Sequence, residues 1–316
     1  MYTVITGGFG HIGSWTARNL IEQGRKVLVL DTRTDVPDCL ADYQAGLIHI
    51  PCDITRFEEL TDVIHQYRES IEGIIHTVGI MGEFVQKAPH RNTEINVNGF
   101  LNSLEVARIF GIKKVVYTST GAVYGAIKGI ASEIRDLPQP ADLYSATKAS
   151  AEIIGLQYGS TFDLDVRIAR VYFIYGPGKL PSQFIKLYRT TFGVLEGLSE
   201  LKMEQGFDQK LDFTNVKDAA RGIGMLYTAQ ELPRQVYNIA TGKAASVGRA
   251  AEIAAGIAVE NTPAEIGPGT LMPRCEALAI ELARQELGYA PQIEIEAGLQ
   301  EYFEWIQHHT GKNKQN

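Results

Sequence analysis

Tyr144 and Lys148 stand four positions apart in the chain. On a helix, this spacing places both side chains on one face, within reach of a common ligand. A free tyrosine has a pKa of about 10 and is a poor base at neutral pH, but a neighbouring ammonium group stabilises its phenolate. The pair therefore has the chemistry to exchange a proton with a substrate hydroxyl or carbonyl. Thr120, at the end of a predicted strand, is placed to bond the same oxygen.

A tyrosine and a lysine at this spacing are, taken alone, more often surface residues, so their role depends on a second motif. Residues 4–13, Val-Ile-Thr-Gly-Gly-Phe-Gly-His-Ile-Gly, predict a strand, a glycine turn and the start of a helix. Glycines spaced G-x-x-G-x-x-G let a turn approach a pyrophosphate, which then sits on the N–H groups of the helix N-terminus. The motif predicts a dinucleotide-binding turn formed by Gly7, Gly10, His11, Ile12 and Gly13.

The strand predicted after this turn, over residues 26–30, ends in Asp31. An acidic residue about 20 residues after the glycines is where a carboxylate accepts hydrogen bonds from the adenosine ribose. This carboxylate would repel a 2′-phosphate, which favours NAD over NADP as the cofactor. Arg33, two residues later, is a type of side chain that accommodates a 2′-phosphate, so NADP stays the less favoured alternative.

Alternating strands and helices must position these residues. Strands are predicted near residues 4–6, 26–30, 47–50, 73–79, 113–120, 165–169 and 236–239, and helices at 57–67 and 93–110. This alternation predicts an α/β fold with a Rossmann-type doubly wound parallel sheet. Because the carboxyl ends of parallel strands meet at one edge, we expect Asp31, Asp53, Gly79 and Thr120 to converge on one crevice.

The later part of the chain predicts a smaller C-terminal substrate lobe, because the alternation there breaks into shorter helices and loops. The dinucleotide-binding domain is expected over residues 1–176 and about 213–243, and the lobe over about 177–212 and 244–309. Residues 310–316 are polar and lack apolar periodicity, which predicts a disordered tail.

The composition is ordinary for a soluble globular protein, with 316 residues, 45% hydrophobic and 21% charged. The net charge of -7 gives no sign of a nucleic-acid partner. No stretch is apolar enough to span a bilayer, and the first strand leaves no room for a signal peptide, so we expect a cytoplasmic protein. Cys39, Cys52 and Cys275 are odd in number and lack metal-type spacing, which predicts reduced thiols and no metal site.

Five motifs in order resemble the extended short-chain dehydrogenase/reductases, the NAD-dependent epimerase/dehydratase family. They are residues 6–13, 119–125 (Ser-Thr-Gly-Ala-Val-Tyr-Gly), 144–148, 175–178 (Tyr-Gly-Pro-Gly) and 212–218 (Asp-Phe-Thr-Asn-Val-Lys-Asp). The resemblance covers nearly the whole chain and implies this fold and an NAD-dependent enzyme. It says less about the substrate, because one scaffold hosts many reactions.

The resemblance implies roles for the matching residues. Tyr144 would be the general acid/base, and Lys148 would tune it and hold the nicotinamide ribose. Thr120 matches the catalytic Ser/Thr position of the family. The cofactor residues that the resemblance adds are Asp31 for the adenosine ribose, Asp53 and Ile54 for the adenine edge, and the backbone around Val78 and Gly79 for the pyrophosphate side.

Two departures from the family pattern concern the substrate. Sugar-nucleotide enzymes of the family usually carry Asn where this chain has Phe173, and Arg where it has Leu211. Both usual residues contact the nucleotide-sugar, and neither phenylalanine nor leucine can donate to a diphosphate. Lys179 and Arg274 are alternative donors. The loss of both residues favours a smaller alcohol or ketone as substrate.

The leading hypothesis is an NAD-dependent oxidoreductase acting at a secondary alcohol or ketone of a small non-nucleotide substrate, such as a sugar acid or a cyclic alcohol. The alternative is a nucleotide-sugar 4-epimerase or dehydratase with tightly bound NAD. A non-catalytic dinucleotide sensor is disfavoured because Thr120, Tyr144 and Lys148 are all present. Met81 and Arg91, on a loop that could cover the substrate, complete the substrate-binding candidates.

Small residues on the helices near 94–110 and 144–160 permit close packing of helices. In the family, helices at these places resemble a four-helix dimer contact, so we expect a homodimer through them. The small residues are Gly99, Ala107, Ala146, Ala149, Ala151 and Gly155.

Overall fold

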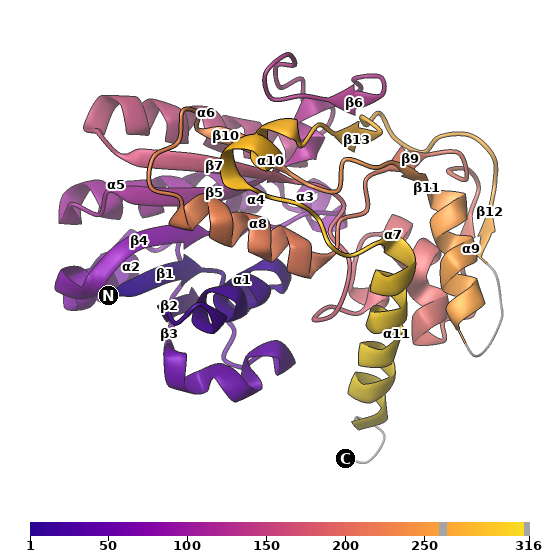
Figure 1. The fold of residues 1–316 in the computed structure, drawn as a ribbon, viewed down its shortest axis with the longest axis horizontal. Helices are drawn as coiled ribbons and strands as arrows, with labels where there is room; N and C mark the ends of the chain where they lie inside the picture. The colour runs from indigo at the N-terminus through magenta and orange to yellow at the C-terminus, as the bar shows by residue number, and fades with distance from the viewer. Residues whose placement is uncertain (259–263, 313–316) are drawn as a thin grey trace.

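A computed structural model of the chain describes residues 1–258 and 264–312. Seven parallel strands form one sheet in the order β10-β7-β5-β4-β1-β2-β3 (Figure 1). All seven expected strands are present, and the predicted Rossmann-type α/β fold is confirmed. The strands are β1 (Tyr2–Thr6), β2 (Lys26–Asp31), β3 (Leu47–Pro51), β4 (Ile71–His76), β5 (Lys114–Thr120), β7 (Asp165–Val171) and β10 (Val236–Ile239).

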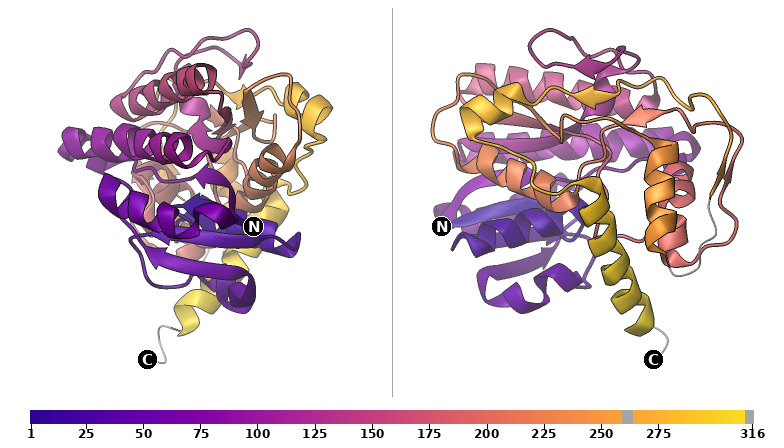
Figure 2. Two further views of the ribbon diagram at one scale, coloured as in Figure 1. Left: turned by 90° about the vertical axis from the view of Figure 1, so that its left-hand side faces the viewer. Right: turned by 45° about the vertical axis from the view of Figure 1, so that its right-hand side comes forward.

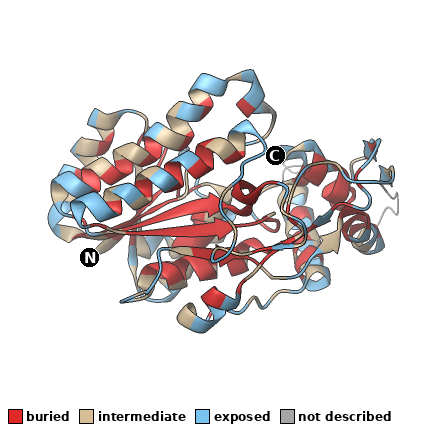
Figure 3. Cartoon of the chain, turned by 90° about the horizontal axis from the view of Figure 1, so that it is seen from above, coloured by how far each residue is buried: buried red, intermediate tan, exposed pale blue. Residues whose placement is uncertain are grey.

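Helices cover both faces of the sheet because successive strand residues point to opposite sides. On one face, Ile5 and Val29 pack with α1 (His11–Glu22) and α8 (Val216–Thr228). On the other, Val4 and Leu28 pack with α2 (Phe57–Tyr67), α5 (Gly99–Phe110) and α6 (Leu143–Phe162). Figure 3 shows the strands buried between these two helical layers.

The small residues of α5 and α6 serve packing within the chain. A Cβ on Gly155 would lie 2.8 Å from the Phe100 ring of α5, and Ala107 and Ala151 are fully buried in the same core. Figure 2 shows the two helices lying side by side. Five of the six small residues are thus buried within one chain and Ala146 is half-buried, so most of them pack against the chain's own residues. The homodimer stays a prediction.

The lobe has its own apolar core, at the right of Figure 1. It is built from α7 (Lys186–Phe192), α9 (Val247–Ile257) and α11 (Ile295–Lys312). Two pairs of very short strands complete it: β8 (Lys202–Met203) with β12 (Glu265–Ile266), and β9 (Lys210–Leu211) with β11 (Ala245–Ser246).

Part of the segment expected in the lobe returns to the sheet domain. Strand β13 (Ala277–Leu278) pairs with β6 (Ile130–Ala131), and α10 (Glu281–Leu287) packs Leu282 into the core beside α1 and α8. Its apolar face covers the sheet near β10, which the alternation of elements did not reveal.

The expected tail also differs from the prediction, because α11 extends through Lys312. The Thr310 hydroxyl donates to the Ile306 carbonyl at 2.8 Å, as a helical residue can. Residues 310–312 are thus helical, and residues 313–316 lie outside the described part of the chain. No helix in the described ranges is long and apolar enough to cross a membrane.

Candidate active site

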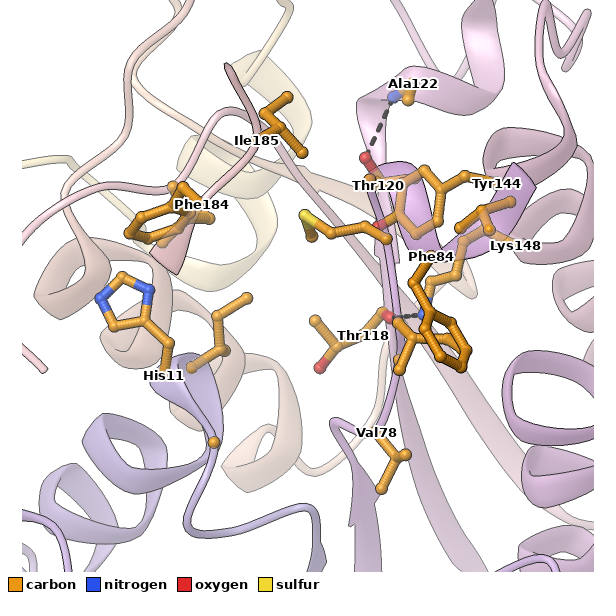
Figure 4. A pocket seen from close by; sticks show the side chains of 18 of the residues that line it. His11, Val78, Phe84, Thr118, Thr120, Ala122, Tyr144, Lys148, Phe184 and Ile185 are labelled. Carbon is orange, nitrogen blue, oxygen red and sulfur yellow. Dashed lines mark hydrogen bonds between the residues drawn. The ribbon is translucent and has the colours of Figure 1, made fainter. Parts of the chain in front are cut away.

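A cleft of about 1540 Å³ lies at the carboxyl ends of the strands, bordered by residues of the sheet domain and of the lobe. Asp31, Asp53, Gly79 and Thr120, which follow or end four strands, all line it. The structure therefore brings these residues together, as the parallel topology predicts. Figure 4 shows part of the cleft from close by.

The glycine turn at the start of α1 leaves no space for side chains. Gly7 has φ +74°, and a Cβ there would lie 2.8 Å from Val78 Cγ2. A Cβ on Gly13 would lie 2.2 Å from the Gly7 carbonyl oxygen. Gly10 is the N-cap of α1 and provides no side-chain cap, so the first N–H groups of the helix are left for a ligand. This cradle fits a pyrophosphate.

Asp31 completes the cradle at the end of β2. Its carboxylate accepts hydrogen bonds from the backbone N–H groups of Phe9 and Arg33, both at 2.9 Å. Each oxygen keeps a further lone pair, because a carboxylate oxygen can accept two hydrogen bonds. The arrangement fits a dinucleotide whose ribose hydroxyls donate to Asp31. His11, Ile12, Ile54 and Val78 line the same cleft.

Arg91 lies with the predicted adenine residues and not with the catalytic ones. Its guanidinium forms ion pairs with Asp53 at 3.3 Å and with Glu94 at 3.1 Å, and donates to the Thr55 hydroxyl. Arg91 lines the cleft, and its contact with the substrate stays a prediction. The nearby carboxylates hold the arginine at the end of the cleft that β3 supplies.

The predicted catalytic residues lie along one wall of the cleft (Figure 4). Tyr144 and Lys148 belong to α6, whose N-terminus is fixed by a capping box between Asp142 and Ser145. Lys148 is buried, and its Nζ donates to the Thr118 carbonyl at 2.7 Å. These contacts orient the lysine toward the end of β5, where Thr120 also lies.

Burial of their side chains shifts the pKa values of both α6 residues. Desolvation raises the pKa of Tyr144 to about 12, against the opposing effect of the Thr120 hydroxyl. Desolvation also lowers the pKa of Lys148 to about 7, although the Glu152 carboxylate opposes the shift. Tyr144 is therefore protonated at neutral pH and able to act as an acid, while Lys148 is close to losing its charge.

Asn96 is a positioning residue that the sequence did not indicate. It is fully buried in a π-helical turn, Glu94–Asn98, of the type often found at functional sites. Its side chain accepts from the Ile80 N–H at 2.9 Å and donates to the Ile80 carbonyl at 3.1 Å. It thereby fixes the backbone that runs from Gly79 to Met81 beside the cleft. A change from α- to π-helical geometry leaves no signal in residue periodicity.

Aromatic side chains form the opposite wall. Phe184 and Tyr188 stack with ring centroids 4.7 Å apart, and Tyr188 stacks on Phe173 at 6.1 Å. Figure 4 shows Phe184 and Ile185 across the pocket from Thr120 and Tyr144. Sequence reasoning missed Phe184, Ile185 and Tyr188, because their loop and helix carry no motif.

Phe173 and Leu211, the two departures from the family pattern, lie in different parts of the structure. Phe173 lines the cleft and has φ +37°, a left-handed conformation that is unfavourable for a bulky residue. Leu211 is fully buried in the lobe core and does not line the cleft. The expectation that Leu211 contacts the substrate is therefore wrong, because its apolar side chain packs inside the lobe.

Arg274 and Lys179, the two alternative donors for a phosphate, both line the cleft but have different partners. Arg274 lines the cleft but forms an ion pair with Asp142 and donates to the Pro273 carbonyl. Lys179 lines the cleft beside the glycine turn, where its Nζ lies 4.3 Å from the Phe184 ring centroid.

Met81, the remaining substrate candidate, lines the cleft and is 46% exposed. Within the described residues, no group of three or more His, Cys, Asp or Glu could hold a metal ion.

Comparisons with known proteins agree with this geometry. The model of the NAD dependent epimerase/dehydratase family matches residues 3–240. A UDP-glucuronate 4-epimerase of Thermodesulfobacterium geofontis is 27% identical over 315 residues, covering 96% of this chain and 95% of the relative. A dTDP-glucose 4,6-dehydratase of Streptomyces antibioticus is 30% identical over 258 residues, covering 77% of this chain and 72% of the relative.

Solved structures share the fold over the whole chain. UDP-glucose 4-epimerase of Thermotoga maritima, crystallised with UDP-glucose, matches with a TM-score of 0.87 and 24% identity, covering 98% of this chain and 100% of that chain. A dTDP-glucose 4,6-dehydratase of Bacillus anthracis in complex with NAD matches with a TM-score of 0.82 and 25% identity, covering 100% and 98%. NAD is thus the cofactor that the glycine cradle and Asp31 fit.

Proposed function

Because the chain belongs to the NAD-dependent epimerase/dehydratase family and is an NAD-dependent enzyme, we propose that it transfers hydride at a secondary alcohol or ketone of a small substrate without a nucleotide. A sugar acid or a cyclic alcohol has the required chemistry. The observation that carries this proposal is the aromatic side chain of Phe173 in the cleft, at the position where sugar-nucleotide enzymes of the family usually carry Asn.

Tyr144 passes the proton in this reaction. NAD, when bound, accepts or returns the hydride. In the reducing direction the neutral Tyr144 hydroxyl protonates the forming alkoxide, which suits its raised pKa of about 12. In the oxidising direction the same oxygen must first lose its proton, and a charged Lys148 stabilises the phenolate. Thr120 bonds the reacting oxygen and orients it toward Tyr144.

The substrate subsite offers few donors for a diphosphate. Leu211 is buried in the lobe, Phe173 presents a ring, and the Arg274 guanidinium is already paired with Asp142. A diphosphate would need charge-assisted hydrogen bonds to offset the loss of its hydration. The stacked rings of Phe173 and Tyr188 instead favour the apolar face of a small ring.

A nucleotide-sugar 4-epimerase or dehydratase is the second candidate. Its support is the set of UDP-sugar and dTDP-sugar enzymes to which nearly the whole chain is similar. Such an enzyme would use Tyr144, Lys148 and Thr120 in the same way, but would return the hydride to its own oxidised intermediate. Arg274 would then leave Asp142 and bind a phosphate.

The test is calorimetric titration of the NAD-loaded protein with UDP, dTDP and GDP. We expect no binding, followed by NADH production at 340 nm with members of a panel of hydroxy acids, aldonates and cyclic alcohols. Micromolar binding of one nucleotide, with cofactor retained through gel filtration and no net NADH, would contradict the proposal and establish the epimerase. The variant Phe173→Asn serves as a matched control: it restores a donor, and we expect it alone to gain nucleotide affinity.

A further inference from the structure

The loop that follows β7 is bonded to His11 and Trp15, in the first two turns of α1. The Trp15 indole donates to the Pro177 carbonyl at 2.8 Å, and His11 Nε2 lies 3.1 Å from the carbonyl oxygens of Gly176 and Pro177. Gly178 has φ +105°, and a Cβ there would lie 3.3 Å from the Trp15 indole nitrogen. These contacts hold the loop against the helix N-terminus and so fix the position of the next residue, Lys179.

The Lys179 ammonium lies beside the glycine turn. Its Nζ is 4.3 Å from the centroid of the Phe184 ring, and that ring meets the His11 ring edge-on at 5.5 Å. Among the residues that the structure describes, no carboxylate forms an ion pair with Lys179. A second cation is close, because the Arg33 guanidinium donates to the Phe9 carbonyl of the same turn at 2.8 Å.

Positive charge therefore gathers near the N-terminus of α1, where the Asp31 carboxylate bonds backbone N–H groups of Phe9 and Arg33 and forms no ion pair with Lys179 in the described chain. Burial, followed by the charge of Lys179, lowers the pKa of His11 to about 4, and burial, followed by Arg33, lowers the pKa of Lys179. The helix dipole adds a partial positive charge at the same place. Such an arrangement is costly unless an anion binds there.

We propose that Lys179, supplied by the loop after β7, binds the phosphates of NAD at the N-terminus of α1, where Arg33 provides a second positive charge beside the glycine turn. A phosphate near the α1 N-terminus gains a charge-assisted contact from the Lys179 ammonium, which has no other anionic partner in the described chain. This role differs from that of a substrate diphosphate ligand, because His11, Phe184 and Arg33 belong to the surroundings of the cofactor turn. The proposal rests on NAD binding and does not depend on the identity of the substrate.

The test compares three ligands on the nucleotide-free protein by calorimetry: NAD, ADP-ribose and adenosine. We expect Lys179→Met to weaken NAD and ADP-ribose alike by about tenfold, the usual worth of one charged contact, and to leave adenosine unchanged. The methionine keeps an apolar stem against Phe184, so the loop should fold normally, which thermal unfolding would verify. Raising the salt to about 1 M should shrink the difference, since salt screens the attraction.

Two further variants separate charge from structure. Lys179→Arg keeps the cation and should retain most of the NAD affinity. Lys243→Met removes the same charge from an exposed lysine that pairs with Glu294 and does not line the cleft, and should leave NAD affinity unchanged. An unchanged NAD affinity in Lys179→Met would overturn the proposal. Weaker NAD binding with ADP-ribose bound normally would also overturn it, because both ligands carry the same two phosphates.

Discussion

Tyr144 is the residue on which the proposed proton transfer depends. Replacing it with phenylalanine removes one oxygen and leaves the ring, so Tyr144→Phe should keep NAD affinity within about twofold and lower turnover by a factor of about 10² to 10⁴. Steady-state kinetics with the substrate found by the NADH screen measures the loss, and calorimetry measures NAD binding.

The control is Tyr43→Phe. It removes a hydroxyl that donates a hydrogen bond to the Glu22 carboxylate, and Tyr43 does not line the cleft. Its turnover should match that of the unaltered enzyme. Near-normal turnover in Tyr144→Phe would remove this tyrosine from the mechanism and leave Thr120 as the group nearest the reacting oxygen.

Lys148 should make the stability of the cofactor-free protein depend on pH. Its pKa is lowered from 10.5 to about 7 in the folded chain, so between these values the unfolded chain binds more protons. Stability then rises with pH from about 7 to about 10.5, and the cost of the buried charge is largest below about 7. The variant Lys148→Met lacks this cost, so its Tm should exceed that of the wild type by several degrees near pH 6 and approach it near pH 10.

Differential scanning calorimetry across this pH range measures both curves. The matched variant Lys113→Met removes a lysine whose side chain is 63% exposed. A Tm difference for Lys148→Met that stays constant with pH would show that the lysine does not carry a desolvation cost in the folded state.

Motif spacing predicted which residues reach the cleft better than it predicted what each one contacts. Tyr144, Lys148 and Thr120 lie together because α6 and β5 are regular elements whose ends meet at the sheet edge. Leu211 was misplaced because its side chain packs in the lobe core, and the ion pair between Arg91 and Asp53 was not foreseen. Such partners come from distant parts of the chain, and no local pattern records them.

At the scale of elements, the contact between α1 and its turn is the tightest part of the cofactor cradle. A Cβ on Gly13 would lie 2.2 Å from the Gly7 oxygen and 2.8 Å from Gly8 Cα, both backbone atoms. Gly13→Ala should therefore push the helix away from β1, cost about 1–3 kcal/mol of stability and weaken NAD binding at least about tenfold. Urea unfolding and calorimetric titration with NAD measure the two effects.

Gly256→Ala is the matched control. Gly256 lies in α9, and a Cβ there would meet nothing within 4 Å. Alanine is the better helix former, so this variant should gain up to about 1 kcal/mol and bind NAD normally. If Gly13→Ala behaved in the same way, the close approach of α1 to the turn would not be required.

The strands of the main sheet were the part of this fold that the sequence predicted best. All seven strands of the main sheet follow from apolar runs, and most of these runs are buried on both faces, as β2 shows with only Lys26 exposed. In the edge strand β3, residues 47–50 are only partly buried. The return of α10 to the sheet and the π-helical turn around Asn96 were not predictable. Each depends on which surface remains uncovered once the sheet has formed, a property of the assembled domain.

At the scale of the molecule, exposed apolar side chains of α5 and α6 are better candidates for a homodimer contact than the small residues of these helices. The small residues of α5 and α6 are used within the chain, but the same helices expose large apolar side chains. Ile153 of α6 is 65% exposed and Ile109 of α5 is 47% exposed. Burying such side chains against a second copy would gain roughly 25 cal/mol for each Å² of apolar surface removed from water.

We therefore expect a dimer through α5 and α6 at micromolar concentration, with a mass by light scattering of twice the 34.8 kDa chain. Ile153→Glu should shift the protein to monomer, because two copies of the carboxylate would lose water at the interface. Ile134→Glu makes the same change at a side chain that is 62% exposed on the loop after β6, and should leave the dimer intact. A monomeric wild type would refute the interface, and a dimer that survives Ile153→Glu would move it to another face of the molecule.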